Sequence, residues 1–391
     1  DFHPALIQRS PLPGEAEDST YKAKFAPQLL LDSVDFTINS FLWSPDGKSI
    51  AFAHQPDPLI NTFFKRDISV YDVATETHRS LVSNPSFDGL IDWSPDSKSL
   101  LYSSSLSDST SNYYRNDRYF RIDLDGNNNK ELGAGFDENL NGLQWTPAGI
   151  FGTAYQKTNR TVIQVNPQTG AVKIVPNNLP RTWSLSFSDD GQRVAYLGRG
   201  DKDLNEVYLA DLSFTNPNKL TDASKQISQW ATSNSEVISW KSQDGAEIEG
   251  VLHKPQDYDP AKKYPLLVAI HGGPTGISMP DPVPSYVYPM VQWLNKGALI
   301  LQPNYRGSAG YGEAFRSLNV RNLGVGDAWD VESGVDHLIE RGLVDGSRVG
   351  SMGWSQGGYI SAFLTTHSDK FKAISVGAGI SNWMTYYVNT D

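Results

Sequence analysis

The sequence contains no cysteine among its 391 residues. That absence excludes disulfides, thiolate nucleophiles, and zinc or iron–sulfur centres held by cysteine. No apolar run approaches the roughly 20 residues that a membrane-spanning helix needs. Lys and Arg are scattered and together number 33 against 44 Asp and Glu, which gives a net charge of −11. Because phosphate neutralisation needs clustered cations, nucleic acid is not an expected partner.

Other absences bear on cofactors and location. No cluster of His, Asp and Glu has metal-ligand spacing, and no phosphate-binding loop is present, so we predict neither a metal nor a cofactor. A chain without cysteine fits an exported protein as well as one that is indifferent to redox conditions. We slightly favour a secreted or periplasmic location over the cytoplasm, and the sequence leaves the compartment open.

A sequence pattern recurs four times in the first 235 residues. A strand-like run ends in an aromatic residue, a turn rich in Pro, Asp and Gly follows, and a second strand-like run comes next. The aromatic residues are Trp43, Trp93, Trp145 and Phe187. Proline at the turn fixes φ and glycine accepts a positive φ, so each copy predicts a β-hairpin.

A second hairpin pattern follows each copy, for example at 68–72 and 122–127. Two hairpins in a period of about 45 residues make a four-stranded blade, and successive blades make a β-propeller. We therefore predict a propeller over residues 1–235 with four legible blades. A β-sandwich is the alternative, and whether residues 1–40 add further strands is left open.

The pattern changes to an α/β domain over residues 236–391. Apolar strands are expected at 264–270, 297–302, 348–352 and 371–376, with helices at 327–341 and from 356 to about 367. Continuous apolar strands that alternate with helices are typical of a mostly parallel sheet covered on both faces.

Ser355 is the candidate nucleophile. It lies in Gly353-Trp354-Ser355-Gln356-Gly357, between an expected strand and an expected helix. This is the context of a nucleophile elbow, where flanking glycines allow a tight turn that presents the hydroxyl above the sheet. A structural glycine-rich turn is the alternative interpretation.

The segment His271-Gly272-Gly273-Pro274 directly follows an expected strand. Acyl transfer develops negative charge on a carbonyl oxygen and needs N–H donors already in place. We expect the backbone N–H groups of Gly273 and Gln356 to be those donors. Alternatively the segment is an ordinary turn with a packed His271.

The loop 303–312 follows another strand and contains Tyr305 and Arg306. Loops at the carboxyl ends of parallel strands line sites. Arg306 can buttress this loop or meet a substrate carboxylate, and we favour the buttress.

These motifs together resemble the prolyl oligopeptidase family, specifically its acylaminoacyl-peptidase-like branch. The resemblance implies an α/β-hydrolase domain with a serine nucleophile, preceded by a propeller that admits short peptides and excludes folded proteins. It also implies substrate-binding positions, for which His271, Tyr305, Arg306, Trp354 and Tyr359 are the candidates.

Two departures from the family pattern affect the interpretation. Only four blades are legible where the family usually has seven or eight, and no acid or base follows Ser355 in the expected order of Ser, Asp, His. Asp369 comes too early, Asp391 is the last residue, and His367 lies twelve helical residues from Ser355, or about 18 Å. The triad Asp and His are therefore expected outside this chain.

We accordingly expect a truncated or cleaved piece of a longer enzyme. The strand at 371–376 would otherwise be an exposed apolar edge, which proteins avoid. Sequence beyond residue 391, a complementing C-terminal chain or a homo-oligomer would complete the site.

The expected function is that of a serine peptidase acting on short or N-blocked peptides through an acyl-enzyme on Ser355. A carboxylesterase with the same constellation is one alternative. A propeller binding module with an inactive hydrolase remnant is another.

Overall fold

The computed structural model describes residues 29–32, 34–105, 114–284 and 288–388. Of these, the residues within 1–108 and 118–132 form one compact unit, and those within 109–117 and 133–390 form a second. Most of the segment 1–40 lies outside the described residues, so its contribution of further strands stays open.

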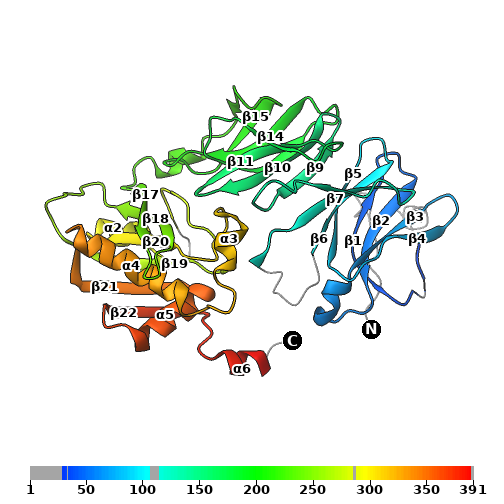
Figure 1. The fold of residues 1–391 in the computed structure, drawn as a ribbon. Coiled ribbons are helices and arrows are strands. Elements are labelled where there is room, and N and C mark those ends of the chain that lie inside the picture. Colours follow the sequence, from blue (N-terminus) through cyan, green and yellow to red (C-terminus); the bar gives the residue numbers. More distant parts are fainter. Residues whose placement is uncertain (1–28, 33, 106–113, 285–287, 389–391) are drawn as a thin grey trace, which may run out of the picture. The chain divides into compact units, whose positions relative to one another are not determined.

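The first unit contains two four-stranded antiparallel sheets (Figure 1). Each sheet corresponds to one copy of the repeat, and the repeated tryptophan ends its first strand. The strands are β1 (Thr37–Trp43), β2 (Ser49–Gln55), β3 (Asp67–Asp72) and β4 (Thr77–Val82), then β5 (Asp88–Trp93), β6 (Ser99–Ser104), β7 (Arg118–Asp123) and β8 (Lys130–Leu132).

The repeated tryptophan also joins neighbouring sheets. The Trp93 indole N–H donates to the Leu42 carbonyl oxygen at 3.1 Å, and its ring is 2% exposed. A buried aromatic ring with its one donor satisfied is a stable contact between two sheets. Trp93 therefore joins the second sheet to the first.

The second unit contains the third and fourth copies. A single bridge between Arg160 and Arg181 joins the two copies into one larger sheet. The strands are β9 (Asn141–Thr146), β10 (Gly149–Gln156), β11 (Asn159–Val165) and β12 (Val172–Val175), then β13 (Arg181–Phe187), β14 (Arg193–Arg199), β15 (Glu206–Asp211) and β16 (Asn218–Lys219).

The turn of the repeat is held by its own side chains. The Ser44 hydroxyl donates to Asp46 Oδ1 at 2.7 Å and accepts from the Ser49 N–H at 2.9 Å. The same bond joins Ser94 to Asp96 and Ser188 to Asp190. These hydroxyls lower the pKa of each aspartate. The repeated Ser-x-Asp sequence is thus a structural turn signal.

The remaining strands form a six-stranded sheet in the order β17-β18-β20-β19-β21-β22. The last four are parallel, and β17 and β18 are an antiparallel extension. Their bounds are β17 (Asn234–Lys241), β18 (Glu247–Lys254), β19 (Tyr264–Ile270), β20 (Leu299–Asn304), β21 (Val344–Trp354) and β22 (Phe371–Gly377). The expected fold class, a propeller followed by an α/β domain, is confirmed.

Helices cover both faces of this sheet. Leu266 and Val268 of β19 pack in one core with α4 and α5, and Ala269 packs in another with α2. Because side chains alternate across a strand, the continuous apolar sequence of β19 supplies both cores. The helices are α2 (Met290–Asn295), α3 (Gly312–Ser317), α4 (Gly326–Glu340), α5 (Gln356–His367) and α6 (Trp383–Val388).

Ion pairs tie the third and fourth propeller sheets to the α/β domain. Lys157 pairs with Glu249 at 2.6 Å, and Arg199 pairs with Asp281. These two sheets and the α/β domain belong to the same compact unit. The predicted domain boundary at 235/236 stays a prediction, and strand β17 begins two residues before it, at Asn234.

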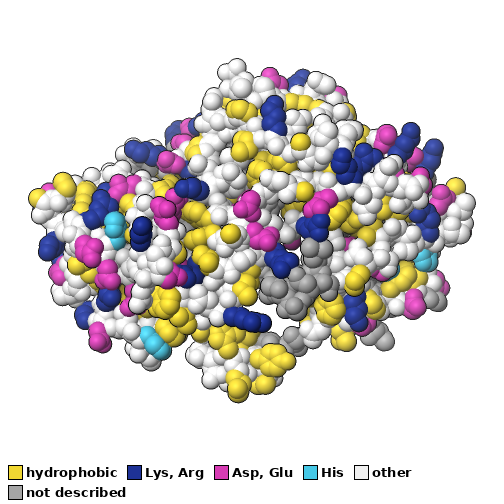
Figure 2. All heavy atoms as spheres, viewed as in Figure 1, with side chains coloured by type: hydrophobic (Ala, Val, Ile, Leu, Met, Phe, Trp, Pro, Cys, Tyr) yellow, Lys and Arg dark blue, Asp and Glu magenta, His cyan; other side chains and the backbone are white. Residues whose placement is uncertain are grey.

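Apolar side chains lie exposed near the end of the described chain. Strand β22 is the edge of the sheet, and Val376 is 47% exposed. In the space-filling view, apolar groups also gather over α6, where Met384 and Tyr387 are exposed (Figure 2). None of the helices that the structure describes has the length and apolar character needed to cross a bilayer.

A buried carboxylate at the start of β15 binds the segment that follows the fourth propeller sheet. Glu206 is fully buried, and its oxygens accept from the Thr221 and Ser224 hydroxyls and from the Ala223 and Ser224 N–H groups. Burial alone would raise the pKa of Glu206, but these hydrogen bonds lower it from 4.5 to about 2. The stability they supply is present above pH 4.5 and is lost as the pH falls through 2.

We therefore expect Glu206→Gln to lower the free energy of unfolding by about 2 kcal/mol at pH 7. The amide group would turn two of its own hydrogens toward protein donors. Urea denaturation at pH 7 and at pH 2.5 measures the effect, which should shrink at the lower pH. Glu247→Gln, at an exposed position, is the control. Equal losses at both pH values would contradict the assignment.

Candidate active site

Ser355 lies at the sharp turn between β21 and α5. Its backbone has φ 57° and ψ −118°, a conformation that costs a residue with a side chain about 1–3 kcal/mol. The Ser355 N–H donates to the Gly377 carbonyl oxygen, and the Tyr359 N–H donates to the Ser355 carbonyl oxygen. Strand, turn and helix thus hold the strained residue from both sides, as the elbow motif predicts.

Glycines make this turn sterically possible. A Cβ on Gly353 would lie 2.1 Å from the Gly357 carbonyl oxygen. One on Gly357 would lie 2.1 Å from the Ile270 carbonyl oxygen. Both distances are well below the 3.0 Å that non-bonded contacts of a Cβ keep. Both carbonyl oxygens belong to the backbone and so cannot turn away as a side chain could. The two glycines of the motif are therefore required by close backbone approach.

Ser355 is exposed, as is the preceding Trp354 at 52%. Gln356, which follows, is buried. The elbow thus presents Ser355 at the surface while its two flanking glycines stay inside. An exposed hydroxyl on a strained turn can reach a substrate carbonyl.

The turn 271–276 packs against the elbow, and we call it the oxyanion turn because it contains Gly273, the predicted oxyanion donor. A Cβ on Gly272 would lie 2.9 Å from the Trp354 carbonyl oxygen and 3.1 Å from the Ser355 Cβ. Gly273 follows with φ +138°, a conformation that favours glycine. The structure therefore brings the two sequence motifs together beside Ser355.

His271 is held by protein groups at both ring nitrogens. Nδ1 lies 2.8 Å from the Gly272 carbonyl oxygen, and Nε2 lies 3.0 Å from the Ser308 Oγ. The ring stacks on Tyr305 with centroids 4.5 Å apart. Burial lowers the pKa of His271 to about 4, so the ring is neutral at pH 7. These contacts favour a packed, supporting His271 over a general base.

Tyr305 is fully buried behind the oxyanion turn. Its hydroxyl donates to the His271 carbonyl oxygen at 2.9 Å. The loop 305–310, which we call the supporting loop, also reaches the turn through the Ala309 N–H, which donates to the Gly276 carbonyl oxygen at 3.2 Å. Tyr305 thus contacts the turn that flanks Ser355.

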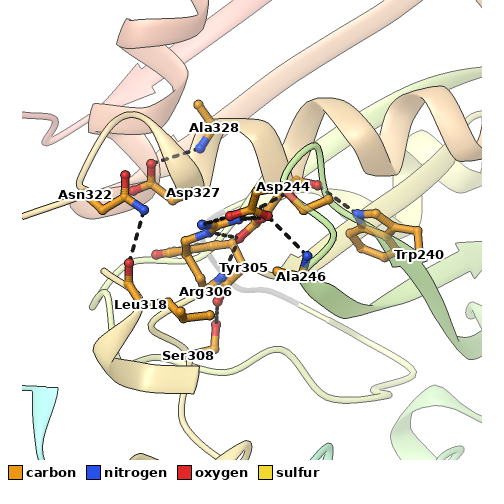
Figure 3. Close-up of polar contacts among 12 residues, drawn as sticks. Trp240, Asp244, Ala246, Tyr305, Arg306, Ser308, Leu318, Asn322, Asp327 and Ala328 are labelled. Atoms are coloured by element: carbon orange, nitrogen blue, oxygen red, sulfur yellow. Dashed lines mark hydrogen bonds and ion pairs between the residues drawn. The ribbon is translucent and has the colours of Figure 1, made fainter. Parts of the chain in front are cut away.

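Arg306 is 1% exposed, and Figure 3 shows it beside Asp244. It pairs with Asp330 and with Asp244, each at 2.8 Å. Its backbone N–H also donates to Asp330. Burial opposes the charge, but both ion pairs raise the pKa of Arg306 above its ordinary value. This geometry favours the buttress interpretation over contact with a substrate carboxylate.

Gln356 is fixed by a buried acid that the sequence analysis missed. Its side-chain amide donates to Asp327 Oδ2 at 3.0 Å, and Asp327 Oδ1 accepts from the Gly324 and Ala328 N–H groups. Burial raises the pKa of Asp327 to about 7. The signal was available for Asp327, which lies four residues before Val331 and so shares the apolar face of the expected helix.

Trp354 lines a cavity of about 620 Å³ together with His271 and Gly272. Arg199 and Asp281 also line it. The cavity therefore extends from the residues beside Ser355 to an ion pair between the propeller and the α/β domain.

Tyr359, the remaining substrate-binding candidate, lies half-buried on the first turn of α5. Its ring meets Trp383 edge-on at 5.4 Å, and its hydroxyl lies against Gly324.

The other histidines described in the second unit lie in these surroundings. His253 is fully buried and bonded to Gln302, and burial lowers its pKa to about 4. His337 belongs to α4, and His367 ends α5 with its Nδ1 at Phe363 O. His367 is twelve residues along the helix from Ser355, about 18 Å away. The expectation that the triad His and Asp lie outside this chain stays a prediction.

Comparison with known proteins gives consistent matches. Residues 285–391 match the model of the prolyl oligopeptidase family. Dipeptidyl-peptidase 5 of Porphyromonas gingivalis is 27% identical over 364 residues, which are 90% of this chain and 52% of that protein. Dipeptidyl peptidase 8 of Homo sapiens is 32% identical over 154 residues, which are 39% of this chain and 17% of that protein.

The fold matches as well. An acylaminoacyl peptidase of Pyrococcus horikoshii superimposes with a TM-score of 0.76 at 24% identity, over 90% of this chain and 54% of that one. At that identity the likeness concerns the fold. The chain spans about half the length of the first of these relatives.

Gly357→Ala should destabilise the domain by about 3 kcal/mol or more, because the added methyl group meets the Ile270 carbonyl oxygen. Thermal unfolding followed by circular dichroism measures the loss. Gly135→Ala is the matched control, since a Cβ there has nothing within 4 Å. Equal melting temperatures for the two variants would show that the elbow tolerates a side chain.

Proposed function

The chain is related to the prolyl oligopeptidase family, and on that basis we propose that it carries the nucleophile of a serine peptidase. The proposed substrates are short or N-blocked peptides, cleaved through an acyl-enzyme on Ser355. The observation that carries the proposal is the exposed Ser355 on a strained turn, against the glycines of the oxyanion turn.

In the proposed mechanism the Ser355 Oγ attacks the peptide carbonyl carbon. A base takes the hydroxyl proton, and the carbonyl oxygen becomes an oxyanion. The backbone N–H groups of Gly273 and Gln356 stabilise that charge, helped by the positive end of α5. The intermediate collapses as the leaving amine takes the proton. Water then hydrolyses the ester and releases Ser355.

We further propose that the base and its acid partner come from sequence beyond residue 391 or from a complementing chain. Two observations support this. His271 is committed to Gly272 and Ser308, and the relatives extend to about twice the matched length. A homo-oligomer that completes the site is the remaining arrangement.

For the substrate, we propose that Trp354 and Tyr359 contact the peptide beside Ser355. Trp354 is exposed and lines the cavity next to the elbow. His271, Tyr305 and Arg306 would act through the turn and loop that they hold. The names of the relatives, dipeptidyl and acylaminoacyl peptidases, support short peptides as the substrate class. The propeller would exclude folded proteins.

Ser355→Ala in the full-length protein should abolish covalent labelling by a fluorophosphonate and lower kcat by at least 10³-fold. The reason is that the hydroxyl is the atom that forms the covalent bond. Labelled protein is detected by mass spectrometry, and Ser347→Ala, at an exposed serine on β21, should label normally. Undiminished labelling of the Ser355 variant would remove Ser355 from the mechanism. Matched amide and ester substrates then separate a peptidase from a carboxylesterase.

The isolated chain of residues 1–391 should hydrolyse peptides at least 10³-fold more slowly than the full-length protein. Without a base, a serine hydroxyl is a weak nucleophile. The two preparations are compared on one chromogenic peptide at pH 7.5, after circular dichroism shows that both are folded. Comparable rates would place the base within this chain, and His271→Ala would then be the first variant to test.

A further inference from the structure

The supporting loop is held from outside the α/β domain. At Gly310 the N–H donates to Glu138 Oε2 at 2.6 Å, and the carbonyl oxygen accepts from the Lys157 N–H at 2.7 Å. Glu138 and Lys157 both belong to the third propeller sheet and its loops. Propeller groups thus hold both backbone polar groups of a single residue of the supporting loop.

Gly310 fits this position only as a glycine. It has φ +92°, and a Cβ would lie 2.6 Å from the Lys157 carbonyl oxygen and 3.0 Å from Ile277 Cδ1. The backbone of the supporting loop therefore touches the propeller backbone directly. A shift of either segment would be transmitted to the other.

Glu138 is the charged residue among the propeller groups that hold Gly310. Its side chain is 1% exposed, and its other oxygen pairs with Arg316 of α3, which is 3% exposed. Arg316 also donates to Asn116 Oδ1 at 2.8 Å. A buried carboxylate with both oxygens bonded has one favourable position, so it fixes the Gly310 N–H precisely in space.

The contacts continue from Gly310 to the elbow. The neighbouring Ala309 N–H bonds to Gly276, and the Ser308 Oγ bonds to His271. Both partners lie in the oxyanion turn, whose Gly272 packs against Ser355. A continuous set of bonded and packed groups therefore leads from the propeller to the proposed oxyanion donor at Gly273.

We propose that Glu138 is a positioning residue for the oxyanion turn. By accepting from the Gly310 N–H it sets the supporting loop, and the loop sets the turn beside Ser355. The propeller then contributes to the chemical step as well as to the exclusion of large substrates. The expected effect on kcat rests on the proposed function. The expected effect on the position of the oxyanion turn rests on the contacts alone.

Two double variants of the full-length protein test the effect of the side-chain oxygen that accepts from the Gly310 N–H. Glu138→Gln with Arg316→Met keeps a carbonyl oxygen for the Gly310 N–H, and Glu138→Ala with Arg316→Met removes it. Neither leaves Arg316 as a buried unpaired charge. We expect kcat of the alanine pair to be about 10-fold lower than that of the glutamine pair, with KM within twofold, because a displaced donor weakens only transition-state binding.

The control is Asp137→Ala in the same propeller loop. Asp137 accepts from the Glu313 N–H at 2.9 Å and therefore holds α3 rather than the supporting loop. Its kcat should stay within twofold of the unsubstituted protein. Equal kcat values for the glutamine and alanine pairs, or an equal loss in the control, would overturn the proposal.

Hydrogen exchange separates this inference from the proposed function. Backbone amides of residues 271–276 should exchange faster in the alanine pair than in the glutamine pair, whether or not Ser355 is a nucleophile. Unchanged exchange would overturn the positioning role. Suppose that exchange is faster in the alanine pair but that a fluorophosphonate does not label the unsubstituted protein. That result would refute the peptidase assignment and leave the positioning role of Glu138 in place. If the alanine pair fails to fold, Glu138→Asp, which is one methylene shorter, must show the same faster exchange and lower kcat.

Discussion

The close approach of three backbone segments at glycines is the constraint on which the site depends. Gly357 packs on the Ile270 carbonyl, Gly353 packs on Gly357, and Gly272 packs on the elbow itself. These are contacts between main-chain atoms, so no change of rotamer can relieve them. The cost of aligning the strained serine with the neighbouring amides is therefore met when the domain folds. In the proposed reaction nothing remains to be reorganised as charge develops.

Buried ionisable side chains form a second layer behind these glycines. Arg306 with Asp330 holds the supporting loop, and Asp327 holds Gln356 at the start of α5. Burying such groups brings little net stability, because desolvation offsets most of the attraction. However, these buried groups can satisfy their hydrogen bonds in only one arrangement. The layer is thus better understood as a source of precision in the loops than as a source of stability.

Much of this architecture was predictable because the signals are local. The repeated aromatic and turn residues gave the propeller sheets, and the apolar run at 264–270 gave a strand with the predicted ends. Two short motifs predict Ser355, Gly273 and Gln356 as site residues, and the structure places their segments side by side. Each of these features depends on neighbours within a few residues.

What was missed depends on distant partners. Asp327 meets Gln356 across 29 residues, and Glu138 meets Gly310 across 172, so no local pattern connects them. The short helices α2, α3 and α6 have only six residues each, too few for a helical period to show. The strand β21 also extends beyond its apolar segment at both ends. Tertiary contacts decide all of these features.

The turn of the propeller repeat has an evolutionary consequence. Serine and aspartate of one copy bond to each other and to the adjacent main chain, and the Asp46 N–H adds one bond to the Ser97 hydroxyl of the next copy at 3.1 Å. A gene duplication that adds or deletes one copy therefore keeps the bonds within each remaining turn. Blade number can drift among homologues while the hairpins themselves persist.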